Sequence, residues 1–215
     1  MQIYKTKQEL KPEEKDYIFE LVSNDFELNQ KMDLLVSSYQ RLKLDPNGFK
    51  YLIKALCEKL DLNPHFPRKG DVNERYDVLI DNPSGGYGII TEVEIPSTAI
   101  LDAPRNLLDD IAVLTNRRGV KTDNLIPLVM CWDFPNNRTD YWNVVKDIKD
   151  VLSIEIKTCS ILALAVLAWT ENGFDARSDS YYLIPTKNSL DNVLEILVSY
   201  GIDEQKYKGL FYPIK

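Results

Sequence analysis

Histidine and cysteine are scarce in this sequence, with one histidine and three cysteines among 215 residues. His65 lies in the segment Asn-Pro-His-Phe-Pro, which is typical of a loop, and no nucleophile can be assigned to it. A serine or cysteine nucleophile activated by histidine is therefore not favoured. Cys57, Cys131 and Cys159 are far apart and lack paired spacing, which predicts free thiols in a reducing compartment rather than disulfides or a zinc site.

Long apolar runs are also missing. The longest, Ile161–Trp169, has nine residues, whereas a membrane-spanning helix needs about 20. Met1 begins a polar, charged segment without an apolar signal region, so we expect no secretory targeting and a cytoplasmic location.

Positive charge is in deficit, because 26 Lys and Arg stand against 33 Asp and Glu, for a net charge of −7. Proteins that bind nucleic acids usually present a basic face, so this balance counts against such a partner. It does not exclude one, since net charge hides how the charges are distributed.

The composition is that of an ordinary globular protein, with 44% hydrophobic and 27% charged residues and no visible internal repeat. Apolar spacing, prolines in first turns and terminal glycines predict helices over Lys11–Val22, Phe26–Leu42, Asn47–Leu60, Ala103–Arg118, Thr139–Leu152 and Ser189–Tyr200. Two strands are predicted to form a hairpin over Asp77–Glu94. Further strands are predicted over Leu125–Trp132, Ser160–Trp169 and Ser180–Pro185. For Ser160–Trp169 a short buried helix is the alternative, because periodicity alone does not separate the two.

This order of elements predicts the α/β class, with a mixed central β-sheet flanked by helices. We expect residues 46–215 to form one compact α/β domain, preceded by an N-terminal helical extension over residues 1–45.

Acidic residues occur inside the hairpin. One apolar run carries Asp77, a glycine-rich turn follows, and a second apolar run carries Glu92 and Glu94. A buried carboxylate is costly unless it is paired or binds a metal. Strand alternation sends Glu92 and Glu94 to one face, and Asp77 joins them if it pairs opposite either one. A slip of one residue would set Asp77 against Val93 and separate the acids.

Three carboxylates on one face form a hard-oxygen donor set suited to Mg²⁺ or Mn²⁺. The alternation fits equally well a hairpin that exposes its acidic face to solvent. Asp81, which lies close to the turn, is interpreted as a cap or turn residue rather than a ligand.

Tyr76-Asp77 followed by Glu92-Val93-Glu94 resembles the signature of the PD-(D/E)XK nuclease superfamily, which includes restriction endonucleases and Holliday-junction resolvases. The helices predicted over Asn47–Leu60 and Ala103–Arg118 stand where that family's common core places its helices. The resemblance implies a restriction-endonuclease-like core and hydrolysis of phosphodiester bonds in DNA, dependent on Mg²⁺ or Mn²⁺. Asp77, Glu92 and Glu94 would be its catalytic residues and metal ligands.

The sequence departs from that signature at two positions. Tyr76 replaces the proline, and Glu94 replaces the lysine that is thought to orient or activate the attacking water. Some restriction endonucleases of the superfamily carry glutamate there. Several members add an acidic residue from the first core helix, for which Glu58 is the candidate here, and Glu20 on the first helix of the chain is the alternative.

Basic residues flank the predicted site and are candidate phosphate contacts, although such clusters also occur as solvated helix ends. They are Arg68, Lys69, Arg75, Arg117, Arg118 and Lys121. Cleavage of both DNA strands would most simply use a homodimer. Two alternatives stay open: a catalytically inactive nuclease-fold module that binds DNA or a protein, and a small-molecule-binding α/β protein. No phosphate loop supports the latter, because Gly85-Gly86 precedes a strand rather than a helix.

Overall fold

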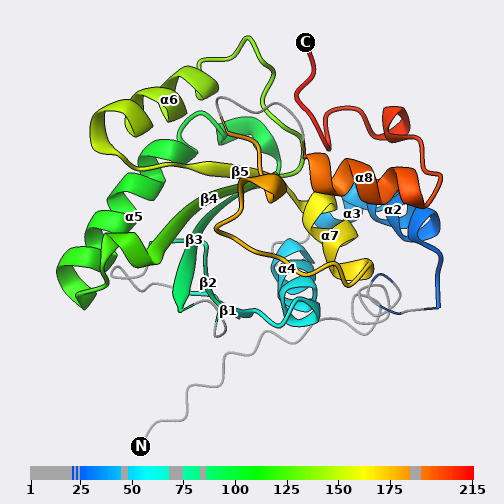
Figure 1. The fold of residues 1–215 in the computed structure, drawn as a ribbon, viewed down its shortest axis with the longest axis horizontal. Helices are drawn as coiled ribbons and strands as arrows, with labels where there is room; N and C mark the ends of the chain where they lie inside the picture. The colour runs from blue at the N-terminus through cyan, green and yellow to red at the C-terminus, as the bar shows by residue number, and fades with distance from the viewer. Residues whose placement is uncertain are drawn as a thin grey trace, which may run out of the picture.

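A mixed β-sheet forms the centre of the computed structural model, which describes residues 21, 23, 25–44, 48–67, 75–82, 86–184 and 190–215 (Figure 1). Within these residues the strands are β1 (Asn63–His65), β2 (Val78–Asn82), β3 (Tyr87–Glu94), β4 (Leu125–Cys131) and β5 (Lys157–Ser160), and they lie side by side in that order. The first three strands are antiparallel, and β4 and β5 run parallel to β3. The predicted α/β class with a mixed central sheet is confirmed.

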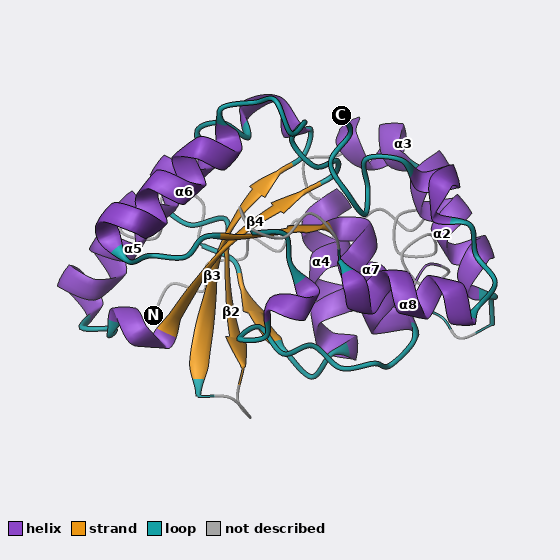
Figure 2. Cartoon of the chain, turned by 45° about the horizontal axis from the view of Figure 1, so that its top comes forward, coloured by secondary structure: helices purple, strands orange, loops and turns teal. Residues whose placement is uncertain are grey.

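Helices cover both faces of the sheet (Figure 2). On one face lie α5 (Ala103–Arg118) and α6 (Tyr141–Leu152), and α5 packs on β3 and β4. On the other face lie α4 (Gly48–Lys59) and α7 (Ile161–Trp169), with α2 (Leu28–Ser37), α3 (Tyr39–Leu44) and α8 (Asp191–Ser199) packed around them. The apolar core continues through both layers.

Most predicted helices are found within a few residues of their expected bounds. The helix predicted over Phe26–Leu42 is divided at Ser38 into α2 and α3, which pack on α7 and α4 respectively. The helix predicted over Lys11–Val22 lies outside the described residues apart from Leu21, which is buried.

The strand predicted over Ser160–Trp169 is wrong. Strand β5 ends at Ser160, whose Oγ accepts a hydrogen bond of 3.1 Å from the Ala163 N–H and thereby caps α7. All nine residues of α7 are buried, so the sequence shows no polar face from which to read a period. Alanine and leucine, which make up most of the run, favour the helix.

Two further differences concern strands. Over the described part of Ser180–Pro185 the chain forms a 3₁₀ turn, Asp179–Tyr181, and a single bridge from Leu183 to Thr158 instead of the predicted strand. Conversely, His65 belongs to β1 rather than to a loop. Pro64 is tolerated in β1 because this strand lies at the edge of the sheet.

Asp81 is not a cap or turn residue but part of β2. Its Oδ2 lies 3.0 Å from the Nε2 of His65 on the neighbouring strand. This exposed pair joins β1 to β2 at the edge of the sheet, away from Asp77 and Glu92.

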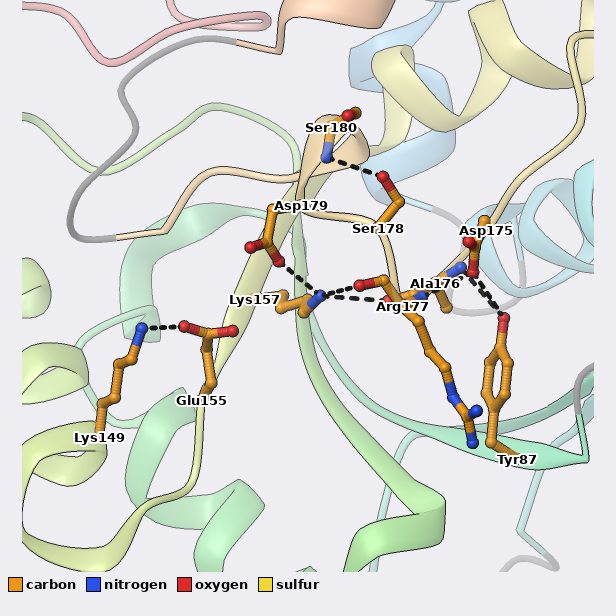
Figure 3. A network of polar contacts seen from close by, with 10 residues as sticks. All are labelled: Tyr87, Lys149, Glu155, Lys157, Asp175, Ala176, Arg177, Ser178, Asp179 and Ser180. Carbon is orange, nitrogen blue, oxygen red and sulfur yellow. Dashed lines mark hydrogen bonds and ion pairs between the residues drawn. The ribbon is translucent and has the colours of Figure 1, made fainter.

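A segment after α7 is fastened across the amino ends of β3 and β5 (Figure 3). Lys157 is buried, and its Nζ donates to Asp179 Oδ1 at 2.9 Å and to the carbonyls of Ala176 and Arg177. The Tyr87 hydroxyl accepts from the Ala176 N–H at 3.1 Å. These contacts close the end of the sheet opposite to the carboxyl end of β3.

The three cysteines are buried as free thiols, as predicted. In the part of the chain that the structure describes, every helix is too short or too polar to cross a bilayer.

Candidate functional site

The register of the hairpin brings Asp77 to Glu92. Val78 pairs with Thr91 at the end of the β2–β3 ladder. The next residue on each strand is Asp77 and Glu92, so these two lie opposite each other. Asp77 Oδ2 also accepts a hydrogen bond of 2.8 Å from the Val93 N–H, which ties the start of β2 to the end of β3. Of the two registers that unite the acids, the structure has the one that pairs Asp77 with Glu92. The one-residue slip does not occur.

Glu92 points toward α5. It keeps only 7% of its surface exposed, and its Oε2 accepts a hydrogen bond of 3.3 Å from Asn106 Nδ2. Its carboxyl group is also electrostatically coupled to the carboxyl group of Asp110, which is 3% exposed. Two bare carboxylates repel each other, so this pair favours a state in which one of them is protonated or a cation lies nearby.

Asp110 was not among the residues predicted from the sequence. It shares a helical face with Leu107, Ile111 and Leu114, all of which are buried. Spacings of three and four residues place these side chains on the side of α5 that packs on the sheet. An aspartate in an otherwise apolar stripe was the signal that could have identified it.

Burial and mutual repulsion raise the pKa of the clustered carboxyl groups. For Glu92, burial and then the charge of Asp77 raise the pKa to about 8. Burial also raises the pKa of Asp110 to about 6. The side chain of Asp77 reaches solvent, but the protein packed around its carboxyl group displaces water and raises its pKa, which the Val93 N–H opposes. The pKa of Glu94, at the end of β3, is raised by burial and by the charges of Asp77 and Asp102.

These four acids thus form one electrostatically coupled group at the carboxyl end of β3, defined here as the carboxylate cluster: Asp77, Glu92, Glu94 and Asp110. Ligand sites of open α/β sheets commonly lie at this end of the parallel strands. Carboxylate oxygens are the donors that Mg²⁺ and Mn²⁺ prefer, and a buried acidic oxygen without a donor is a fitting partner for such an ion. Among the described residues, however, no three His, Cys, Asp or Glu side chains are gathered as in a formed metal site.

Some of the other predicted residues are placed by the structure. Arg75 lies at the cluster, where it forms an ion pair with Asp109 and lowers the pKa of Asp110. Glu58 is exposed on α4, on the opposite face of the sheet, with its Oε1 3.7 Å from Lys54 Nζ.

The remaining predicted residues lie away from the carboxylate cluster or outside the described residues. Arg117 and Arg118 are exposed at the end of α5, and Lys121 is exposed in the loop that follows, which leads away from the carboxyl end of β3 toward the start of β4. Glu20, Arg68 and Lys69 lie outside the described residues.

No family model matches the sequence, and no curated protein matches it. Among solved structures, the restriction endonuclease FokI is similar with a TM-score of 0.46 and 11% identity. The match covers 80% of this chain and 33% of FokI, so the chain spans about a third of that protein's length.

Proposed function

We propose that this protein is a divalent-metal-dependent nuclease of the PD-(D/E)XK superfamily that hydrolyses phosphodiester bonds in DNA. One observation carries the proposal: the hairpin register sets Asp77 opposite Glu92, with Glu94 in the same electrostatically coupled group. Asp77 directly precedes β2, Glu92 and Glu94 lie on β3, and α4 precedes the hairpin while α5 follows it, which supports the resemblance.

In this proposal Asp77 and Glu92 hold Mg²⁺ or Mn²⁺. A bound ion of this kind polarises the scissile phosphate, lowers the pKa of its bound water and stabilises the leaving oxygen. Asp77 is exposed and its Oδ2 is held by the Val93 N–H, whereas Glu92 is buried against α5. Ligation requires the carboxylate cluster to draw together, which charge repulsion opposes when no cation is present.

Glu94 takes the place of the motif lysine and accepts the proton of the attacking water. It is only partly buried, and its raised pKa brings it closer to neutrality, as suits a general base. Arg75 is exposed beside the cluster and can exchange Asp109 for a phosphate oxygen, because a surface ion pair contributes little stability. DNA is the proposed partner, and a homodimer would allow both strands to be cut.

Cleavage assays test the proposal. The wild type is incubated with Mn²⁺ and supercoiled plasmid, single-stranded DNA or a four-way junction, in parallel with Asp77→Asn and Glu92→Gln. Asp81→Asn is the matched control, because it removes the same charge from the same hairpin away from the cluster. We expect cleavage by the wild type and the control only. Cleavage that survives both substitutions at the cluster would contradict the proposal.

A second candidate function is a catalytically inactive module with the same fold that binds DNA or a protein. Two observations favour it: the motif lysine is absent, and the described residues do not include a formed metal site. Retained binding to duplex or junction DNA without cleavage in Mg²⁺ or Mn²⁺ would favour this candidate over the first.

A further inference from the structure

One oxygen of the buried Asp110 carboxyl group lacks the hydrogen-bond donor that such an oxygen normally has. Asp110 is 3% exposed, and its Oδ2 is closed off from solvent. That oxygen receives no hydrogen bond from an N–H or hydroxyl group of the described residues. Burying an acidic oxygen without a donor is costly, and native structures rarely tolerate it without a reason.

The nearby donors are directed elsewhere. Asn106, one helical turn earlier on α5, donates to Glu92, and the Arg75 guanidinium pairs with Asp109. The neighbours of Asp110 on its own helical face, Leu107 and Ile111, are apolar. The polar group to which the Asp110 carboxyl group is electrostatically coupled is another acid, Glu92.

We infer that Asp110 is a ligand of the divalent cation and shares that cation with Glu92, so that α5 supplies a carboxylate in addition to those of the hairpin. This inference rests on the proposed function. It adds a ligand that neither the signature residues nor their spacing identifies. A cation between Glu92 and Asp110 would satisfy the unpartnered oxygen and remove the repulsion between the two acids at once.

A purely structural role is the competing explanation. In that case Glu92 and Asp110 hold a shared proton that fastens α5 to β3, and Asp110 has no part in metal binding. The two explanations differ in what happens when Mn²⁺ is added to the protein without DNA.

The test is a Mn²⁺ titration of the full chain without DNA at pH 8, followed by electron paramagnetic resonance and calorimetry. We compare the wild type with Asp110→Asn and with Asp109→Asn, which removes the same charge from the adjacent, exposed position of α5. We expect Asp110→Asn to weaken Mn²⁺ binding at least tenfold and Asp109→Asn to change it less than threefold. Equal Kd values for Asp110→Asn and the wild type would overturn the inference.

Failure of the proposed function would look different. If the wild type binds no Mn²⁺, the result contradicts both the proposed function and this inference. If the wild type and Asp110→Asn bind Mn²⁺ equally well, the result contradicts only the role of Asp110 as a ligand. If Asp110→Asn does not fold, Fe²⁺ with ascorbate and peroxide is applied to the wild type, since the radicals formed cut the chain beside the bound ion. Cuts near residues 77, 92 and 110 support the inference, and cuts confined to the hairpin overturn it.

Discussion

Replacing Glu92 by glutamine should stabilise the metal-free protein at high pH. Glutamine has the shape of the neutral glutamic acid, and its amide can donate to Asp110 while its oxygen still accepts from Asn106. The substitution thus preserves the contacts of Glu92 and removes the charge that burial disfavours.

The magnitude follows from the pKa of Glu92, which is raised from 4.5 to about 8. Each pKa unit corresponds to about 1.4 kcal/mol, so complete ionisation of Glu92 costs the folded state at most about 5 kcal/mol. Below pH 4.5 the side chain is protonated in both the folded and the unfolded protein. As the pH rises toward 8 the unfolded chain loses this proton first, so the wild type loses stability that Glu92→Gln keeps. We expect a gain of roughly 2 to 4 kcal/mol at pH 9 and almost none at pH 4.5.

Urea unfolding in EDTA, measured by circular dichroism at several pH values from 4.5 to 9, gives the free energies. Glu58→Gln is the control, because it removes a glutamate that is exposed on α4, and its effect should stay within about 0.5 kcal/mol. A Glu92→Gln protein less stable than the wild type at pH 9 would refute the reasoning. So would a difference between the two that does not change with pH.

Four further outcomes are expected. Mg²⁺ or Mn²⁺ at one hundred times Kd should stabilise the folded wild type by about 2.7 kcal/mol and so raise its melting temperature, and Glu92→Gln should lose most of this response. An unchanged melting temperature in the wild type would count against the metal site. Asp179→Asn should lower the free energy of unfolding by about 1 to 2 kcal/mol, because it leaves the buried Lys157 ammonium without a carboxylate; full stability in urea would show that the Ala176 and Arg177 carbonyls suffice. Leu167→Ala, in the middle of the buried helix α7, should cost about 3 kcal/mol, whereas Val198→Ala, which is 71% exposed, should change stability little; similar losses would contradict the packing described for α7 and α8. Ellman's reagent should leave Cys57, Cys131 and Cys159 unmodified in the native protein and titrate three thiols in urea, since all three are buried; rapid reaction of the native protein would contradict that burial.

Local signals in the sequence determined much of the secondary structure. Helix α5 begins with Pro104 in its first turn and ends before Gly119, which adopts the left-handed conformation at φ 67°. Both features act within one helical turn, so they can be recognised without tertiary contacts. The hairpin was predictable for a similar reason, because two apolar runs separated by a glycine-rich turn are close in the sequence.

Tertiary packing decided what these local signals left open. A fully apolar run has no polar face to show its period, so only burial among α2, α4 and α8 established that Ile161–Trp169 is the helix α7. Likewise, alternation allowed Asp77 to face Glu92 or Glu94, and the ladder between β2 and β3 selected Glu92.

The sequence by itself determined which acids lie on the hairpin and that Glu92 and Glu94 share a face, because strand alternation is a property of neighbouring residues. The tertiary structure alone decided that Asp110 joins them. Its contact with Glu92 arises from the way α5 packs on β3, which no spacing along the chain encodes. The chemistry of the carboxylate cluster therefore depends on a contact between two elements, each of which was predictable separately.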